Sequence, residues 1–269
     1  MAEHGVLRIA TCQFPVRGDV RRNARFICRQ MRIASERGAE IVHFPEAALS
    51  GYAGSDFASF QGYPWETLAE ETRRVRELAA ELRLWTLLGS SHRPPRGRPT
   101  NCLYLVDPSG RIAKRYDKCF LTPQDRPHYQ PGRRVVTHTL GGVKFGLAIC
   151  FDFRFPELWR AYLRRGCRLV FLSSYQSRRD RFPLMEEVAP AILATRASEN
   201  FVYVVANNTT GGHPWHSSRI VLPQGNVARR APAGRPAVLG WTIDLSADRR
   251  FYNPIGSLAL RAARGTLHS

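Results

Sequence analysis

The stretch LAICFDFRFPEL, residues 147–158, decides how the chain is built. An apolar run typical of a buried strand ends at Cys150, and a charged, aromatic segment with a proline then opens a helix. The thiol is thereby placed at the end of a strand, with Asp152, Arg154 and Glu157 directly behind it. This position suits either a catalytic nucleophile held by a rigid strand or a small, buried structural side chain. The rest of the sequence must distinguish between these two roles.

Short apolar strands alternate with amphipathic helices along the chain. The spacing of apolar residues predicts helices over 21–37, 65–82, 156–165 and 190–199, the last of them beginning at Pro190. Strands are expected over 6–14, 39–44, 84–90, 143–149, 168–173, 201–206, 218–222 and 238–245, with Gln224-Gly225 turning between the last two. The turn sequence DPSG joins 101–106 to 112–116 as a hairpin. This alternation predicts an α/β fold in which helices cover mixed sheets.

Length and composition favour a single domain over residues 1–269. The chain is 43% hydrophobic, and no linker or internal repeat divides it. No apolar stretch approaches the roughly 18 residues that a membrane span needs, and the N-terminal MAEHGVLRIATCQF lacks the pattern of a secretion signal. The six cysteines form no CxxC pair and are expected to be reduced. We therefore expect a cytoplasmic protein without a membrane partner.

The formal net charge of +18 raises the question of a nucleic-acid partner. All but three of the 40 basic residues are arginines, and these are spread along nearly the whole chain. A uniform preference for arginine over lysine indicates a compositional bias and a solvated basic surface. A nucleic-acid partner is therefore not expected.

Three stretches each place one reactive side chain just after an apolar strand: HFPEAALSGY at Glu46, RYDKCFLTP at Lys118 and AICFDFRFPEL at Cys150. The ends of neighbouring strands can converge although they are distant in sequence. A thiol is a strong nucleophile only as the thiolate, so it needs a base such as Glu46 or a cation such as Lys118 nearby. The ammonium would also stabilise an oxyanion, as would the backbone N–H of Phe151. Taken singly, each residue is also explained by packing, helix capping or solvation.

Together the three stretches resemble the nitrilase superfamily of carbon–nitrogen hydrolases. The matching residues are Phe44-Pro45-Glu46 with Gly51-Tyr52, Tyr116 and Lys118 with Leu121, and Cys150 and Asp152 with Arg154-Phe155-Pro156-Glu157. Further similarity runs from Gln13 through Pro131-Gly132 to Arg196–Asn200, so it covers nearly the whole chain. The resemblance implies a four-layer αββα sandwich with two mixed sheets, a homodimer or higher homo-oligomer, and no metal or organic cofactor.

The resemblance also implies a reaction. Glu46, Lys118 and Cys150 would hydrolyse a non-peptide C–N bond of a small linear amide or N-carbamoyl compound through a thioester, with Phe151 supplying an oxyanion donor. A nitrilase acting on a nitrile, and a catalytically silent relative with a basic surface for binding, stay open as alternatives. Many members carry a second glutamate after the lysine motif. Here Asp125, which is one methylene shorter, takes that place as a possible auxiliary acid.

Substrate-binding candidates are the side chains expected near the same strand ends, namely Tyr52, Phe57, Asp125, His128, Phe151, Tyr175, Gln176 and Asn207. One arginine of the segment 177–181 could meet a substrate carboxylate, although an exposed basic loop is the simpler explanation. No metal site is expected, because His213 and His216 have no third ligand at suitable spacing. Arg154 and Glu157 are expected to form a buried structural pair behind the thiol.

Overall fold

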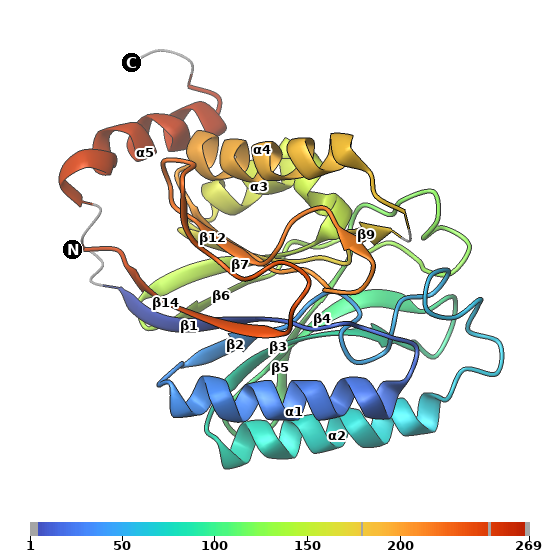
Figure 1. The fold of residues 1–269 in the computed structure, drawn as a ribbon. Helices are drawn as coiled ribbons and strands as arrows, with labels where there is room; N and C mark the ends of the chain where they lie inside the picture. Colours follow the sequence, from blue (N-terminus) through green and yellow to red (C-terminus); the bar gives the residue numbers. More distant parts are fainter. Residues whose placement is uncertain (1–4, 179, 247–248, 267–269) are drawn as a thin grey trace.

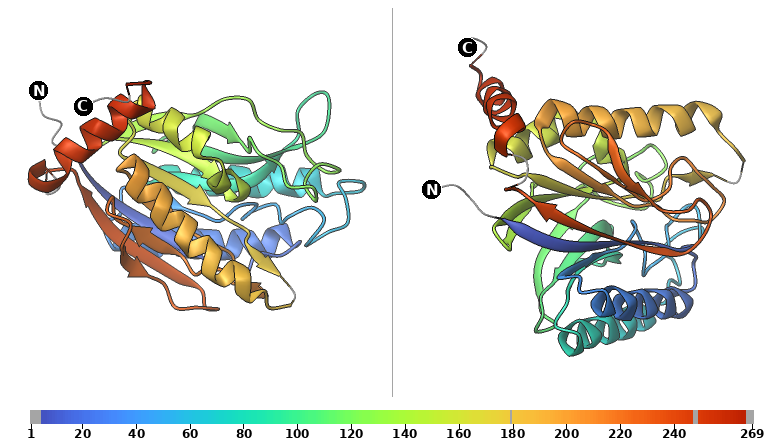
Figure 2. Two further views of the ribbon diagram at one scale, coloured as in Figure 1. Left: turned by 90° about the horizontal axis from the view of Figure 1, so that it is seen from above. Right: turned by 60° about the vertical axis from the view of Figure 1, so that its left-hand side comes forward.

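Two six-stranded sheets face each other across an apolar layer, and helices cover the outer face of each (Figure 1). The computed structural model describes residues 5–178, 180–246 and 249–266. The right-hand view of Figure 2 shows the same order of layers: helices, sheet, sheet and helices. The predicted four-layer αββα sandwich with two mixed sheets is confirmed.

The first sheet is built around three parallel strands from the N-terminal part of the chain. Its order is β14-β1-β2-β3-β4-β5, in which β1, β2 and β3 are parallel and the other neighbours antiparallel. The strands are β14 (Ala237–Asp244), β1 (Val6–Gln13), β2 (Ile41–His43), β3 (Trp85–His92), β4 (Thr100–Val106) and β5 (Ile112–Asp117). The helices α1 (Val20–Glu36) and α2 (Trp65–Glu81) cover its outer face with their apolar sides.

The second sheet follows the same plan, in the order β13-β12-β10-β8-β7-β6 with β7, β8 and β10 parallel. The strands are β13 (Val227–Arg230), β12 (Arg219–Val221), β10 (Tyr203–Ala206), β8 (Leu169–Ser173), β7 (Val143–Ile149) and β6 (Thr137–Leu140). The helices α3 (Pro156–Arg164) and α4 (Pro183–Asn200) cover this sheet, and α5 (Arg249–Ala263) packs beside them. The 3-10 helix η1 (Cys150–Arg154) follows β7, and β9 (Ser177–Arg178) pairs with β11 (His213–Pro214). None of the described helices combines the length and apolar character that crossing a membrane requires.

Alternation of side chains along the strands builds the core between the sheets. In β7, Phe145, Leu147 and Ile149 face the opposite sheet, while Ala148 faces the helices. All four are fully buried, and each of the larger side chains stabilises the fold by about 1.5–3 kcal/mol relative to exposure. The packing makes β7 a rigid mount, and Cys150 follows directly after its last residue.

The helix expected to begin at Pro190 begins at Pro183 instead. Pro183 occupies the first turn of α4, and Pro190 lies inside the helix. An interior proline removes a backbone hydrogen bond, but Met185, Ala189 and Leu193 are buried in the layer between α4 and the second sheet. This burial outweighs the lost hydrogen bond, so the prediction of the helix start was wrong.

The turn at Gln224-Gly225 joins different strands from those expected. It connects β12 to β13 within the second sheet, whereas β14 belongs to the first sheet and pairs with β1. The sequence of β13, VARR, is mostly exposed and has no apolar alternation, which is why it was not predicted. The helix α5 was not predicted either, because Pro254 and Gly256 interrupt its pattern.

Candidate active site

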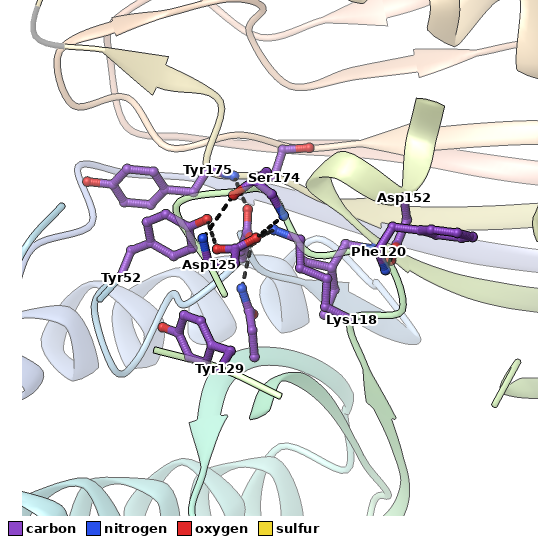
Figure 3. A network of polar contacts seen from close by, with 12 residues as sticks. Tyr52, Lys118, Phe120, Asp125, Tyr129, Asp152, Ser174 and Tyr175 are labelled. Carbon is purple, nitrogen blue, oxygen red and sulfur yellow. Dashed lines mark hydrogen bonds and ion pairs between the residues drawn. The ribbon is translucent and has the colours of Figure 1, made fainter. Parts of the chain in front are cut away.

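The three reactive side chains singled out in the sequence meet between the two sheets. Glu46 follows β2, Lys118 follows β5 and Cys150 follows β7. Lys118 Nζ lies 2.8 Å from Glu46 Oε1 and 2.8 Å from Asp125 Oδ2, and Figure 3 shows the ammonium directed towards Asp125. Glu46, Lys118 and Asp125 all lie near enough to Cys150 for their charges to shift the pKa of its thiol. We call Glu46, Lys118 and Cys150 the Glu–Lys–Cys cluster.

Glu46 reaches the cluster because the chain turns sharply after β2. Ala47 has a φ of 52°, and the backbone of Pro45 packs directly on β3 at Gly89. A Cβ at Gly89 would lie 1.9 Å from the carbonyl oxygen of Pro45, so only glycine permits this approach. A larger residue at Gly89 would therefore displace the segment that carries the carboxylate.

Three donors hold the Glu46 carboxylate. Lys118 Nζ and Asn101 Nδ2 donate to Oε1 at 2.8 and 2.7 Å, and the backbone N–H of Tyr175 donates to Oε2 at 2.8 Å. Asn101 was not singled out from the sequence. Its signal is its place in the β4–β5 hairpin, where the N–H of Lys118 donates to Asn101 O at 2.8 Å. A carboxylate fixed in this way needs little reorganisation when it takes a proton.

The thiol of Cys150 is presented on a strained turn. The residue has a φ of 45°, in the left-handed region that residues other than glycine rarely adopt. Asp152 secures the turn by accepting three hydrogen bonds. They come from Ile149 N–H at 2.8 Å, Phe120 N–H at 2.9 Å and the Tyr116 hydroxyl at 2.7 Å. The sharp turn after a buried strand places the sulfur at the rim of the sheet.

Asp125 reaches Lys118 despite its short side chain. The turn that follows Thr122 brings it close, since Asp125 N–H donates to Thr122 O at 3.0 Å and Thr122 N–H donates to Asp125 Oδ2 at 2.9 Å. The Tyr52 hydroxyl donates to Asp125 Oδ1. The aspartate thus bridges a pocket residue and the buried ammonium (Figure 3).

The charges of the cluster keep the ammonium protonated and the thiol neutral at rest. Burial opposes charge on Lys118, but its neighbours, chiefly Glu46, raise its pKa well above the ordinary value. Burial also opposes charge on Asp125, yet Lys118 and hydrogen bonds hold the pKa of this carboxyl below its usual range. Burial and the charge of Glu46 raise the pKa of Cys150 well above the usual range, with Lys118 opposing them. Such a thiol attacks only if a neighbouring base removes its proton.

A pocket of about 890 Å³ opens onto Cys150. Four of the expected substrate-binding residues line it, namely Tyr52, Phe151, Tyr175 and Gln176. Arg17, Asp56 and Arg154 also line the pocket, and none of the three was proposed from the sequence as a substrate contact. The pocket therefore joins the reactive thiol to charged side chains at its outer part.

Four expected substrate-binding residues are not part of this lining. One of them, Asp125, is bonded to Lys118 of the Glu–Lys–Cys cluster, and the other three lie elsewhere among the described residues. Phe57 packs within an aromatic cluster, and His128 lies against Gly54. Asn207 is fully buried and hydrogen-bonded to backbone groups of two neighbouring segments. Contacts with these other segments, which proximity to a strand end does not reveal, keep the three side chains out of the pocket lining.

The segment 177–181 offers no described arginine to the pocket. Arg181 is exposed and pairs with Glu186, with Nη2 2.9 Å from Oε2. Arg179 and the side chain of Arg178 lie outside the described residues. The expected contact with a substrate carboxylate is therefore not supported for Arg181.

Arg154 and Glu157 do not form the buried pair expected of them. Both side chains are exposed, and no ion pair joins them. Arg154 lies over the rings of Phe151 and Phe153, 6.0 and 5.8 Å from their centroids. Glu157 stands in the first turn of α3, where the helix dipole favours a carboxylate in solvent.

The two histidines at 213 and 216 have different surroundings. His213 is exposed on β11, whereas His216 is buried, which lowers its pKa to about 3. Within the described part of the chain, no group of three His, Cys, Asp or Glu side chains is arranged to hold a metal ion.

Asp152 should make stability depend on pH. Burial raises its pKa from 3.8 to about 6, although hydrogen bonds from Tyr116, Ile149 and Phe120 oppose the shift. Between pH 4 and 6 the folded state therefore holds this proton more tightly than the unfolded chain does, so the free energy of unfolding falls as the pH rises. The expected fall from this group is about 3 kcal/mol. Denaturant unfolding of wild type and Asp152→Asn at several pH values measures it, and an unchanged pH slope in the variant would contradict the assignment.

The order of layers and the pocket at the strand ends place this protein in the class of four-layer αββα enzymes. The family model for carbon-nitrogen hydrolases matches residues 8–251, and the chain belongs to that family. Omega-amidase NIT2 of Homo sapiens is 28% identical over 240 residues, which make up 83% of this chain and 84% of that protein.

Solved structures share the fold. The C. elegans NitFhit protein has a TM-score of 0.81 and 26% identity, over 95% of this chain and 65% of that chain. An amidase from Nesterenkonia sp. has a TM-score of 0.75 and 25% identity, over 96% of this chain and 98% of that chain. The protein is therefore a carbon–nitrogen hydrolase whose relatives include amidases.

Proposed function

We propose that this protein hydrolyses the C–N bond of a small linear amide or N-carbamoyl compound through a thioester. One observation carries the proposal: Lys118 is buried and bonded to both Glu46 and Asp125 beside Cys150, where the pocket ends. Burying three charged groups costs free energy that an apolar core would not cost. Buried groups with perturbed pKa values, such as Lys118 and Asp125, are typical of functional sites. The relatives named as amidases support an amide substrate.

In the first step the thiol adds to the carbonyl carbon. Glu46 takes the proton of Cys150 as the sulfur attacks, the C–S bond forms, and the π electrons of the carbonyl move to oxygen. Lys118 and the Phe151 N–H stabilise this oxyanion. The carbonyl then re-forms, the C–N bond breaks, and Glu46 returns the proton to the departing ammonia or amine.

Water completes the cycle. Glu46 removes a proton from a water molecule as its oxygen attacks the thioester carbonyl. The C–S bond breaks, the acyl group leaves as a carboxylic acid, and the sulfur recovers a proton. Asp125 stays ionised throughout and holds the ammonium of Lys118 in position, which its lowered pKa and 2.8 Å contact support.

A panel of small amides, N-carbamoyl compounds and nitriles tests this function through the release of ammonia. Turnover of linear amides or carbamoyl compounds at a higher kcat/KM than nitriles is expected. A preference for nitriles would favour the nitrilase alternative. Absence of turnover across the panel would favour a silent protein with a binding surface.

We also propose that the outer part of the pocket recognises a carboxylate on the substrate. Near the thiol, Glu46 and Asp125 outnumber Lys118, so a second anion is disfavoured there. Arg17 lies in the pocket lining next to Asp56. Each oxygen of Asp56 already accepts one hydrogen bond, from Tyr52 N–H at 2.9 Å and from the Tyr175 hydroxyl at 2.8 Å. The guanidinium of Arg17 has further N–H donors for a ligand.

Arg17→Gln should lower kcat/KM for carboxylate-bearing amides by about 10- to 100-fold, the usual range for a charge-assisted hydrogen bond. The methyl esters of the same amides should change little. Gly211→Ala should act in the same direction, because its Cβ would lie 2.9 Å from Arg17 Nη1 and displace the guanidinium. Arg25→Gln on the exposed face of α1 removes the same charge outside the pocket and serves as the control. Equal losses in Arg17→Gln and Arg25→Gln, or equal losses for acid and ester, would refute the carboxylate site.

A single domain over 1–269 that works as a cytoplasmic homodimer remains part of the proposal. Large apolar side chains are exposed on the helices outside the second sheet. The exposed fraction is 60% for Leu184 on α4, and 49% and 43% for Ile255 and Leu258 on α5. Covering them would favour pairing through this layer. Sedimentation equilibrium should give twice the chain mass, and a monomer at all concentrations would contradict the pairing.

A further inference from the structure

A second polar cluster lies behind the Glu–Lys–Cys cluster, where the ends of the two sheets meet. His43 ends β2 in the first sheet and Ser173 ends β8 in the second, and both are fully buried. His43 Nε2 lies 2.8 Å from Ser173 Oγ. On its other side, His43 Nδ1 lies 3.1 Å from the hydroxyl of Thr11 in β1. The imidazole therefore links three strands. Of its two hydrogen bonds, the one to Ser173 crosses between the sheets, and the ring also packs edge-on against Phe171 of β8, with 5.1 Å between the ring centroids.

The surrounding groups fix which nitrogen of His43 carries the proton. The Ser173 hydroxyl donates to the carbonyl oxygen of Phe44 at 2.8 Å. Its oxygen is then left to accept the N–H of His43 Nε2, and the bare Nδ1 accepts the hydroxyl of Thr11. Burial, which lowers the pKa of His43 to about 3, keeps this neutral form. All three hydrogen bonds thus run in one direction, from Thr11 to Phe44.

This series of hydrogen bonds ends at the two segments that hold the carboxylate of Glu46. Phe44 stands two residues before Glu46 on the segment after β2. Ser173 stands two residues before Tyr175, whose N–H donates to Glu46 Oε2 at 2.8 Å. Asn207 adds a second link, because Nδ2 donates to His43 O at 3.2 Å and Oδ1 accepts Ser174 N–H at 3.3 Å.

We propose that His43, acting through Ser173, is a positioning residue that keeps Glu46 aligned with the Tyr175 amide and with the thiol of Cys150. The inference rests on the proposed role of Glu46 as the base. His43 is not part of the pocket lining, so it acts only through the segments to which it is bonded. Misplacement of a reacting group by about 1 Å can cost about 100-fold in rate. Loss of the His43–Ser173 contact should therefore slow the chemical step without weakening substrate binding.

Ser173→Ala and Thr11→Val form a matched pair that tests this role. Each removes one buried hydroxyl bonded to His43, but Thr11 connects strands within one sheet, whereas Ser173 connects the two sheets. Ser173→Ala should lower kcat by about 10- to 100-fold with KM changed by less than about twofold. Thr11→Val should keep kcat within about threefold of wild type while the two variants lose similar unfolding free energy. Ser173→Cys, with a similar volume and a weak hydrogen-bonding group, should fall between Ser173→Ala and wild type and serves if the alanine variant does not fold.

Parallel losses of kcat in the two variants, in proportion to their losses of stability, would overturn the positioning role. A raised KM with unchanged kcat in Ser173→Ala would also overturn it, because binding would then be the affected property. Both outcomes leave amide turnover by wild type intact, so they are distinct from a failure of the proposed function. Absence of turnover in wild type would remove the proposed function and this inference together.

Discussion

The Cys150→Ala protein is expected to hydrolyse amides at least about 10,000-fold more slowly than wild type. No other described nucleophile takes the place of the sulfur where the pocket meets Glu46 and Lys118. Without the thiol, no acyl-enzyme can form, and the remaining groups can at best orient water. Steady-state release of ammonia, followed at high enzyme concentration, measures the residual rate.

A matched control separates chemistry from the loss of a buried thiol. Cys167 is fully buried in the layer between the second sheet and its helices, and it is not part of the pocket lining. Cys167→Ala should destabilise the fold because the smaller side chain leaves a cavity in the apolar layer. Its kcat/KM should stay within about threefold of wild type. A Cys150→Ala protein with activity within tenfold of wild type would contradict the assignment of the nucleophile.

Lys118→Met should impair both folding and catalysis. The ammonium is fully buried and pairs with two carboxylates, each 2.8 Å away. Removing one partner of such a group leaves uncompensated buried charge, which costs about 3–5 kcal/mol of unfolding free energy. The oxyanion also loses its cation, so kcat should fall by about 100- to 1,000-fold. Denaturant unfolding and steady-state kinetics on the same preparation measure the two effects.

The double variant Lys118→Met with Asp125→Asn distinguishes the two roles of the lysine. Neutralising Asp125 removes one of the two unpaired charges, so much of the lost stability should return. Activity should stay low, because the donor to the oxyanion is still missing. Recovery of turnover in the double variant would show that Lys118 serves stability alone.

The layers of the fold were predictable because each layer leaves a local pattern. Helical and strand periodicity in 21–37 and 143–149 record which face is buried, and α1 and β7 match these patterns closely. Glu46, Lys118 and Cys150 could be predicted for the same reason, because each follows a recognisable strand and the ends of neighbouring strands converge. Their separation of many residues in sequence was bridged by the sheet order, which only the complete fold provides.

Other parts of the site left no such local pattern. In the sequence, Arg17 could not be distinguished from the many other arginines of this chain. Its place in the pocket lining and its close approach to Gly211 are visible only in the folded structure. Asn101 depends on hairpin register, and His43 and Ser173 depend on the approach of two separate sheets. The pairing of β14 with β1 in the first sheet likewise joins segments that are distant in sequence. The turn at Gln224-Gly225 gives no information about this pairing.

Trapping the acyl group on the protein tests the whole account most directly. Wild-type enzyme mixed with a linear amide is quenched in acid at successive times and analysed by intact and peptide mass spectrometry. The mass should increase by the mass of the substrate minus the mass of ammonia, because the acyl group replaces the thiol hydrogen. The increase should appear on the peptide that contains Cys150 and on no other. Ammonia release without an adduct at any quench time, or with the acyl group on a different side chain, would contradict catalysis by the thiol.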